Sequence, residues 1–266
     1  MPARWSMPDI KPQVYKDPRP AEYFARFHER SRTHDPDWVY DLARIIVTPP
    51  CLLFYRTRAI GAEHVPTSGP VILAPNHFSQ WDHFFAGLYV RRKVRFMAKS
   101  QLFSNAVIQF IFRHGGAFPI RRGHRDEEAF KTADAILGMD ECMLIYAEGG
   151  RSRSGGLGEP RPGVGRIALE SGAPVIPVAI HGSLGVRGWR KLRFPKVTVQ
   201  YGEPMRFAAV SEPSREQQLE VAGQIFERVQ DMYTTLDEKG RRGVIKALRK
   251  GIATTTERQV PAGQPR

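Results

Sequence analysis

The sequence predicts an α/β fold in which helices cover both faces of one mixed, mostly parallel sheet. From about residue 71 onward, short apolar runs typical of buried strands alternate with amphipathic segments of helical spacing. The 266 residues, 41% of them hydrophobic, are enough for a single domain with a substantial core. The 21 prolines and 24 glycines follow no fixed period, which argues against a solenoid.

The expected elements follow one another along this region. Apolar runs bounded by glycine, proline or charged residues favour strands, and apolar residues spaced three and four apart favour helices. The expected strands cover residues 71–74, 94–98, 117–120, 143–147, 175–180 and 197–201, and the expected helices cover 82–90, 102–112, 126–137, 165–170 and 214–236.

Residues 1–37 are expected to be an N-terminal extension with one helix over 21–31, and 38–236 the main domain. The most apolar stretch begins at Trp38, but charged residues and two prolines leave it short of the roughly 20 apolar residues that a spanning helix needs. Two interpretations fit residues 38–58: a segment lying in a membrane interface, or a core-packing helix broken by proline.

The C-terminal residues 237–266 are expected to be a basic tail. The formal net charge of the chain is +13, and residues 239–266 alone contain eight Lys or Arg and one Glu. This charge favours an anionic partner: nucleic acid, a membrane surface or a phosphorylated substrate. Part of the tail has the pattern of a basic amphipathic helix suited to anionic lipid, although a solvated helix end fits as well.

Two cysteines, Cys51 and Cys142, both lie in apolar surroundings. This pattern favours neither a disulfide framework nor a zinc site, so we expect a reducing cytosolic setting and no bound metal. The N-terminal residues contain no apolar run of the kind found in secretory signals.

The segment Asn76–His83 raises the question of catalysis. His77 and Asp82 are five positions apart, just after a predicted strand and at the start of a predicted helix. Imidazole accepts a proton near neutral pH, and a carboxylate on its other nitrogen fixes the tautomer and stabilises the imidazolium. Alone, this spacing also fits a structural polar pair at a helix start.

Further clusters lie at the ends of other predicted strands, where the crest of an α/β sheet binds ligands. Lys99, Arg122 and Arg151 together would neutralise a phosphate, and the Gly149-Gly150 turn would let backbone N–H groups approach an anion. No Gly-x4-Gly-Lys-Ser/Thr pattern occurs, so phosphoryl transfer from ATP is not supported.

Four blocks in this order resemble the lysophospholipid acyltransferases of the lysophosphatidate type, over roughly residues 55–205. They are Asn76-His77-x4-Asp82, then Gly116 to Arg122, then Glu148-Gly149-Gly150-Arg151-Ser152, and last Val175-Ile176-Pro177-Val178. Two departures from the usual pattern are Gly150 in place of Thr and Tyr146-Ala147 in place of Phe-Pro.

The resemblance implies transfer of a fatty acyl group from acyl-CoA or acyl carrier protein, as co-substrate and without a cofactor, to the free hydroxyl of lysophosphatidate. His77 would be the base and Asp82 would orient it, while Glu148 would contact glycerol hydroxyls or hold Arg151. The substrate-binding residues implied are Lys99, Gly116, Arg122, Glu148, Gly149, Arg151 and Pro177. We expect a glycerolphosphate acyltransferase-like fold, attached peripherally to the cytoplasmic face of an anionic membrane.

Three rival functions remain open at the level of sequence. Gly150 leaves room for another lyso-lipid or a glycolipid acceptor. A non-catalytic lipid- or nucleic-acid-binding protein on the same scaffold is disfavoured by the His77–Asp82 pair, and a hydrolase by the phosphate-ready cations. Nucleic acid is not expected as a partner, because one basic and aromatic run, 187–194, is poor evidence without a recognised module. That run would equally suit the phosphates of CoA.

Overall fold

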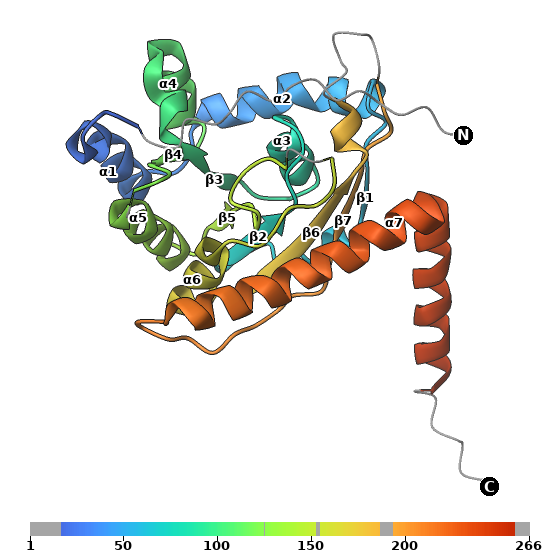
Figure 1. The fold of residues 1–266 in the computed structure, drawn as a ribbon. Coiled ribbons are helices and arrows are strands. Elements are labelled where there is room, and N and C mark those ends of the chain that lie inside the picture. The colour runs from blue at the N-terminus through green and yellow to red at the C-terminus, as the bar shows by residue number, and fades with distance from the viewer. Residues whose placement is uncertain (1–16, 125, 153–154, 187–193, 259–266) are drawn as a thin grey trace, which may run out of the picture.

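The computed structural model describes residues 17–124, 126–152, 155–186 and 194–258, without the side chains of 250–258. It contains a seven-stranded sheet with the order β1-β7-β6-β2-β5-β3-β4 (Figure 1). The strands are Arg58–Ile60 (β1), Val71–Pro75 (β2), Val94–Lys99 (β3), Ala117–Ile120 (β4), Cys142–Leu144 (β5), Val175–His181 (β6) and Thr198–Tyr201 (β7).

Five neighbouring strands, from β6 to β4, run parallel, and β7 pairs antiparallel with β6. Strand β1, which the sequence did not predict, pairs with β7 at the edge. The predicted fold class, a mixed and mostly parallel sheet flanked by helices, is confirmed. Because parallel strands point the same way, the carboxyl ends of β2, β3, β4 and β5 lie along one crest of the sheet.

The helices lie on both faces and around the edge of this sheet (Figure 1). The α-helices are Ala25–Thr33 (α1), Trp38–Leu53 (α2), Asp82–Leu88 (α3), Ala106–His114 (α4), Glu127–Gly138 (α5), Pro162–Ser171 (α6) and Arg215–Arg258 (α7). Short 3-10 turns are formed by Ala21–Phe24 (η1), Ala62–His64 (η2) and Ser100–Ser104 (η3).

Two apolar clusters fill the space above and below the sheet. One joins α5, α6 and α7 to side chains such as Ile72 and Ile145, and the other joins α2 and α3 to side chains such as Leu73 and Leu144. Consecutive residues therefore enter opposite clusters, as the two-residue alternation of a strand requires. The strands are buried on both faces, which explains why they read as continuous apolar runs in the sequence.

The structure differs from expectation in α2, which continues through Pro49 and Pro50 as far as Leu53. Each proline removes a helical hydrogen bond to the residue four before it, here Ile45 and Ile46. These two residues are 69% and 62% exposed, so their carbonyl groups lie where water can replace the lost donors. None of the described helices is long and apolar enough to cross a membrane.

Helix α7 also differs, because it includes both the predicted closing helix and part of the predicted basic tail. The two parts meet at Gly240, whose backbone leaves the helical conformation, and the second part turns away from the sheet (Figure 1). Around this bend Leu236 and Val244 pack against Ile60 of β1. Arg241 donates hydrogen bonds to the carbonyl oxygens of Arg56 and Val197, just before β1 and β7, and to the hydroxyl of Thr198 in β7, so this basic residue is tied to the sheet.

Candidate active site

The predicted catalytic pair lies at the crest, immediately beyond β2. His77 Nδ1 lies 2.9 Å from Asp82 Oδ2, and Asp82 is the first residue of α3. The same oxygen accepts hydrogen bonds from the backbone N–H groups of Phe78 and Ser79, both at 2.6 Å. These contacts fold the loop back on itself. A carboxylate can only accept, so the proton lies on Nδ1 and Nε2 is left with its lone pair.

Burial keeps the His77 ring in its neutral form. Desolvation lowers the pKa of His77, Asp82 opposes this, and the positive charges of Arg151 and Arg122 lower the pKa further. The side chain of His77 is 12% exposed, whereas that of Asp82 is completely buried. A neutral imidazole with one accessible nitrogen at neutral pH is suited to act as a general base.

The turn after β5 holds the backbone of His77 from both sides. The carboxylate of Glu148 accepts from the His77 N–H at 2.7 Å, and the N–H of Ser152 donates to the His77 carbonyl at 2.8 Å. The second oxygen of Glu148 accepts from the Gly158 N–H at 2.7 Å. Burial raises the pKa of Glu148 to about 7, against the lowering effect of these two amides.

The carboxylate of Glu148 therefore stabilises the backbone of the loop around His77. The sequence suggested that it contacts glycerol hydroxyls or holds Arg151, but both carboxylate oxygens accept from backbone amides instead. Gly149 also differs from expectation. Its N–H closes a turn onto the Tyr146 carbonyl at 2.9 Å and its φ of 62° suits glycine, so this amide is not offered to an anion.

The three predicted phosphate-binding cations lie within one electrostatic field. Burial lowers the pKa of Lys99, and the positive charges of Arg151 and Arg122 lower it further. The same two arginines lower the pKa of His77. The charges of Arg122 and Arg151 therefore act on both Lys99 and the His77 imidazole, which indicates that these groups lie in one region of the crest.

Two predicted site residues are not brought to this crest. Gly116 precedes β4 at the opposite end of the strand, with a φ of 83°, and a side chain there would meet Pro36 at 2.7 Å. It is a tight-packing glycine. Pro177 lies buried inside β6, paired with Ala74 of β2, and faces Gly202. Block order predicted both residues, but block membership does not say which end of a strand a residue occupies.

Sequence reasoning gave no role to two residues that hold the site. The amide of Asn76 exchanges two hydrogen bonds with the backbone of Ile180, at 2.7 and 3.2 Å, and so ties the loop to β6. Tyr146 stacks on His77, with ring centroids 3.7 Å apart and an angle of 12° between the planes. The sequence feature that could have drawn attention to Tyr146 is its departure from the usual Phe-Pro pattern of the family.

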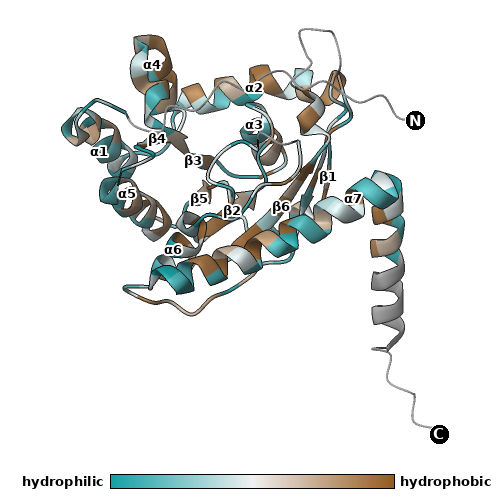
Figure 2. Cartoon of the chain, in the orientation of Figure 1, coloured by the Kyte–Doolittle hydropathy of each residue, from teal (hydrophilic) through white to brown (hydrophobic). Residues whose placement is uncertain are grey.

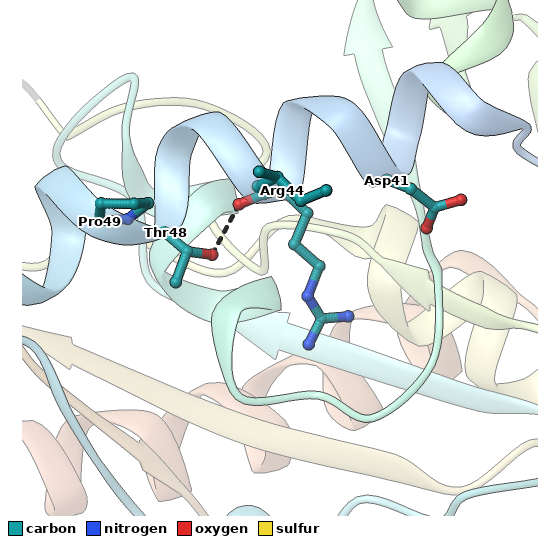
Figure 3. A pocket seen from close by; sticks show the side chains of 5 residues that line it. Asp41, Arg44, Thr48 and Pro49 are labelled. Atoms are coloured by element: carbon teal, nitrogen blue, oxygen red, sulfur yellow. Dashed lines mark hydrogen bonds between the residues drawn. The ribbon is translucent and has the colours of Figure 1, made fainter.

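A separate shallow pocket of about 430 Å³ lies along α2 (Figure 3). Asp41, Arg44, Ile45, Thr48 and Pro49 line it, and Thr48 donates a hydrogen bond to the Arg44 carbonyl at 2.6 Å. None of the predicted site residues lines this pocket. The run 187–193 lies outside the described residues, so its predicted contact with phosphates has no structural description.

Comparison with known proteins shows that this chain is similar to acyltransferases. Residues 56–181 match the model of the Acyltransferase family. The 1-acyl-sn-glycerol-3-phosphate acyltransferase BAT2, chloroplastic, of Brassica napus is 28% identical over 133 residues, which are 49% of this chain and 38% of the relative. The 1-acyl-sn-glycerol-3-phosphate acyltransferase of Bacillus subtilis is 26% identical over 182 residues, which are 66% of this chain and 87% of the relative.

A Streptococcus pneumoniae 1-acyl-sn-glycerol-3-phosphate acyltransferase is 26% identical over 170 residues, 64% of this chain and 61% of the relative. The chain thus spans less than two thirds of the Brassica and Streptococcus relatives. A solved structure, the 1-acyl-sn-glycerophosphate (LPA) acyltransferase PlsC from Thermotoga maritima, matches with a TM-score of 0.56 and 22% identity. It covers 82% of this chain and 89% of that one. At this identity the likeness is one of fold.

Proposed function

Because residues 56–181 match the model of the Acyltransferase family, we propose that this chain transfers a fatty acyl group from a thioester to the free hydroxyl of lysophosphatidate. The product would be phosphatidate, a phospholipid precursor. The observation that carries the proposal is the hydrogen-bonded His77–Asp82 pair, set among three converging cations at the crest of the sheet. The names of the relatives support lysophosphatidate as the acceptor.

The reaction would begin at His77 Nε2. This nitrogen takes the proton of the acceptor hydroxyl as the oxygen attacks the thioester carbonyl carbon. The new C–O bond forms, the C–S bond breaks, and the imidazolium returns its proton to the departing thiolate. Asp82, which accepts from Nδ1, stabilises the imidazolium while it exists. The acyl group passes directly from sulfur to oxygen, so no covalent acyl-enzyme is required.

Lys99, Arg122 and Arg151 would bind the phosphate of the acceptor. An anion placed among them relieves their mutual repulsion, and it holds the hydroxyl at a fixed distance from His77. Gly150, which has no side chain to contact the acceptor, leaves another lyso-lipid or a glycolipid open as the alternative acceptor. The acyl donor would be acyl-CoA or acyl carrier protein.

A panel assay tests this function. Purified protein is offered acyl-CoA or acyl carrier protein together with lyso-acceptors that carry or lack a terminal phosphate monoester, and products are identified by mass. We expect acylation of lysophosphatidate, with a clear preference over acceptors lacking the phosphate. Release of free fatty acid alone would indicate a hydrolase, and binding without turnover of any acceptor would indicate a non-catalytic protein.

The acceptor is a lipid, and we propose that the exposed apolar side chains of α2 and α4 rest on an anionic membrane. Both helices carry apolar segments (Figure 2). Trp38, Leu53 and Val107 are 62%, 72% and 65% exposed, values unusual for large apolar side chains. This attachment would be peripheral, on the cytoplasmic face.

Vesicle sedimentation tests the attachment. Replacing Ile45 and Ile46, both highly exposed on α2, with serine should lower binding to anionic vesicles several-fold, because each isoleucine removes apolar area from water on insertion. The matched control is Leu219→Ser on α7, which is 39% exposed and lies on a different helix. Equal binding by all three proteins would contradict the proposal.

A further inference from the structure

Tyr146 is in direct face contact with the imidazole that we assign as the base. The two ring centroids are 3.7 Å apart and the planes are within 12° of parallel. This separation is that of full van der Waals contact, so the tyrosine ring covers one face of His77. Asp82 meets the edge of the same imidazole at Nδ1. The imidazole of His77 is therefore contacted on one face by the Tyr146 ring and at Nδ1 by Asp82.

The backbone on both sides of Tyr146 is tied to the strand that leads to His77. Ile145 N–H donates to the Leu73 carbonyl at 3.0 Å, and Ala147 N–H donates to the Pro75 carbonyl at 3.3 Å. These bonds extend the parallel pairing of β5 with β2 beyond Leu144. Tyr146 and His77 therefore lie on adjacent segments of the chain that are joined by backbone hydrogen bonds. These bonds restrict the movement of one residue relative to the other.

The hydroxyl of Tyr146 is not what holds it in place. Its oxygen is buried and has no hydrogen-bond partner among the described residues. Burial raises the pKa of Tyr146 well above its ordinary value, so the group stays neutral. A buried hydroxyl without a partner does not stabilise the fold. The contact that remains is the stacked ring.

We propose that Tyr146 is a positioning residue for His77, and that its ring, not its hydroxyl, holds the imidazole in the plane where Nδ1 meets Asp82 and Nε2 faces the acceptor. The role rests on the proposed function, since it matters only if His77 is the base. The ring also excludes water from one face of the imidazole. The titratable or charged groups around His77 are Asp82 and His83 of α3, Arg122 after β4, and Glu148 and Arg151 after β5.

The test compares two substitutions of one side chain. Tyr146→Phe keeps the ring and should retain the activity of the wild type. Tyr146→Leu removes the ring, and should lower kcat roughly three- to tenfold, the range expected for loss of an aromatic contact, with little change in KM. The lower limb of the pH profile of kcat/KM should also move to higher pH, because the His77 ring is better solvated without its cover.

A second readout needs no substrate. The pKa of His77 is followed by NMR titration of labelled imidazole, assigned by comparison with His77→Gln. It should rise in Tyr146→Leu and stay constant in Tyr146→Phe. Phe85→Leu is the control, because Phe85 is a completely buried ring of the α2–α3 cluster without a described contact to His77. It should lower the stability of the protein without changing the pKa of His77.

The outcomes separate the two proposals. If Tyr146→Leu changes neither kcat nor the pKa of His77, or if Tyr146→Phe loses as much activity as Tyr146→Leu, the positioning role is overturned. If the pKa of His77 responds as expected but the wild type acylates no acceptor, the stacking is supported and the proposed function fails. Should Tyr146→Leu not fold, Tyr146→Met supplies a longer and more flexible apolar side chain without a ring, and the same readouts apply.

Discussion

The two ends of strand β3 carry basic side chains in opposite electrostatic settings. Near its amino end, Arg95 is 2% exposed, forms an ion pair with Glu141, and donates to the His34 carbonyl at 2.7 Å. At its carboxyl end, Lys99 lies in the positive field of Arg122 and Arg151, which lowers its pKa. The first cation is paired with a carboxylate of the fold, whereas the second is repelled by two other cations, an arrangement that the proposed phosphate of the acceptor would relieve.

This difference distinguishes basic side chains that stabilise the fold from basic side chains suited to bind a ligand. A buried cation with its own carboxylate contributes to the native state, and removing one partner leaves the other unpaired. Cations that repel one another reduce stability until a ligand binds, and such a cost is typical of a binding site. Four predictions use this contrast, beginning with the largest effect.

His77→Ala should lower kcat by about 10²-fold or more, because it removes the proposed general base from the carboxyl-end crest. The fold should be retained, since Asp82 keeps the backbone amides of Phe78 and Ser79 and the loop is held mainly through backbone contacts. Steady-state kinetics on lysophosphatidate measure the loss, and circular dichroism checks the fold. An unchanged kcat would remove His77 from the mechanism.

Arg95→Met should reduce the free energy of unfolding by about 1–3 kcal/mol, because the partly buried carboxylate of Glu141 loses its partner. The kcat of the protein that remains folded should be close to that of the wild type, since Arg95 lies at the other end of the strand. Chemical denaturation and activity assays are run on the same preparation. A large loss of kcat with unchanged stability would contradict the structural role that we assign to Arg95.

Arg151→Ala should raise KM for the phosphorylated acceptor about tenfold or more, with a much smaller effect on the acyl donor. It should also weaken the thermal stabilisation that inorganic phosphate gives to the wild type, because the site has lost one of its cations. The control is Arg228→Ala, an exposed arginine of α7. Equal changes in KM for both substrates would indicate that Arg151 is structural.

Glu148→Gln should flatten the dependence of stability on pH. The folded pKa of Glu148 is raised to about 7 from 4.5, so the native state binds this proton more tightly than the unfolded chain. Its contribution to stability is largest below pH 4.5 and is lost as the pH rises to about 7, by up to roughly 3 kcal/mol. Denaturation at pH 5 and pH 8, compared between wild type and variant, measures this difference. Identical pH dependence in the two proteins would contradict the raised pKa.

Much of the site was predictable because it depends on local pattern. The sequence placed His77, Lys99, Arg122 and Arg151 just beyond apolar runs, and parallel strands bring such positions to one crest. Gly116 was expected there too, yet it precedes its strand. Sequence order alone fixes whether a residue comes before or after a strand, so this error came from treating the whole block as one site.

Other features depend on contacts between distant segments. Glu148 and Ser152 meet the backbone of His77 across about 70 positions of sequence, in a register that pairing of β5 with β2 decides. No local pattern states which acceptor a buried carboxylate will find. Helix α2 likewise passes through Pro49 because its carbonyls face solvent, a consequence of where the helix lies on the sheet.

The amino-acid sequence by itself determined the alternation of strands and helices and the fold class. It also supplied the candidate site residues that follow the strands, since each of these features depends on residues close together in the chain. Tertiary structure decided which of these side chains share one field, which carboxylate serves the backbone, and that a tyrosine covers the face of His77. Those outcomes follow from strand register and from desolvation, which arise only when segments far apart in sequence pack together.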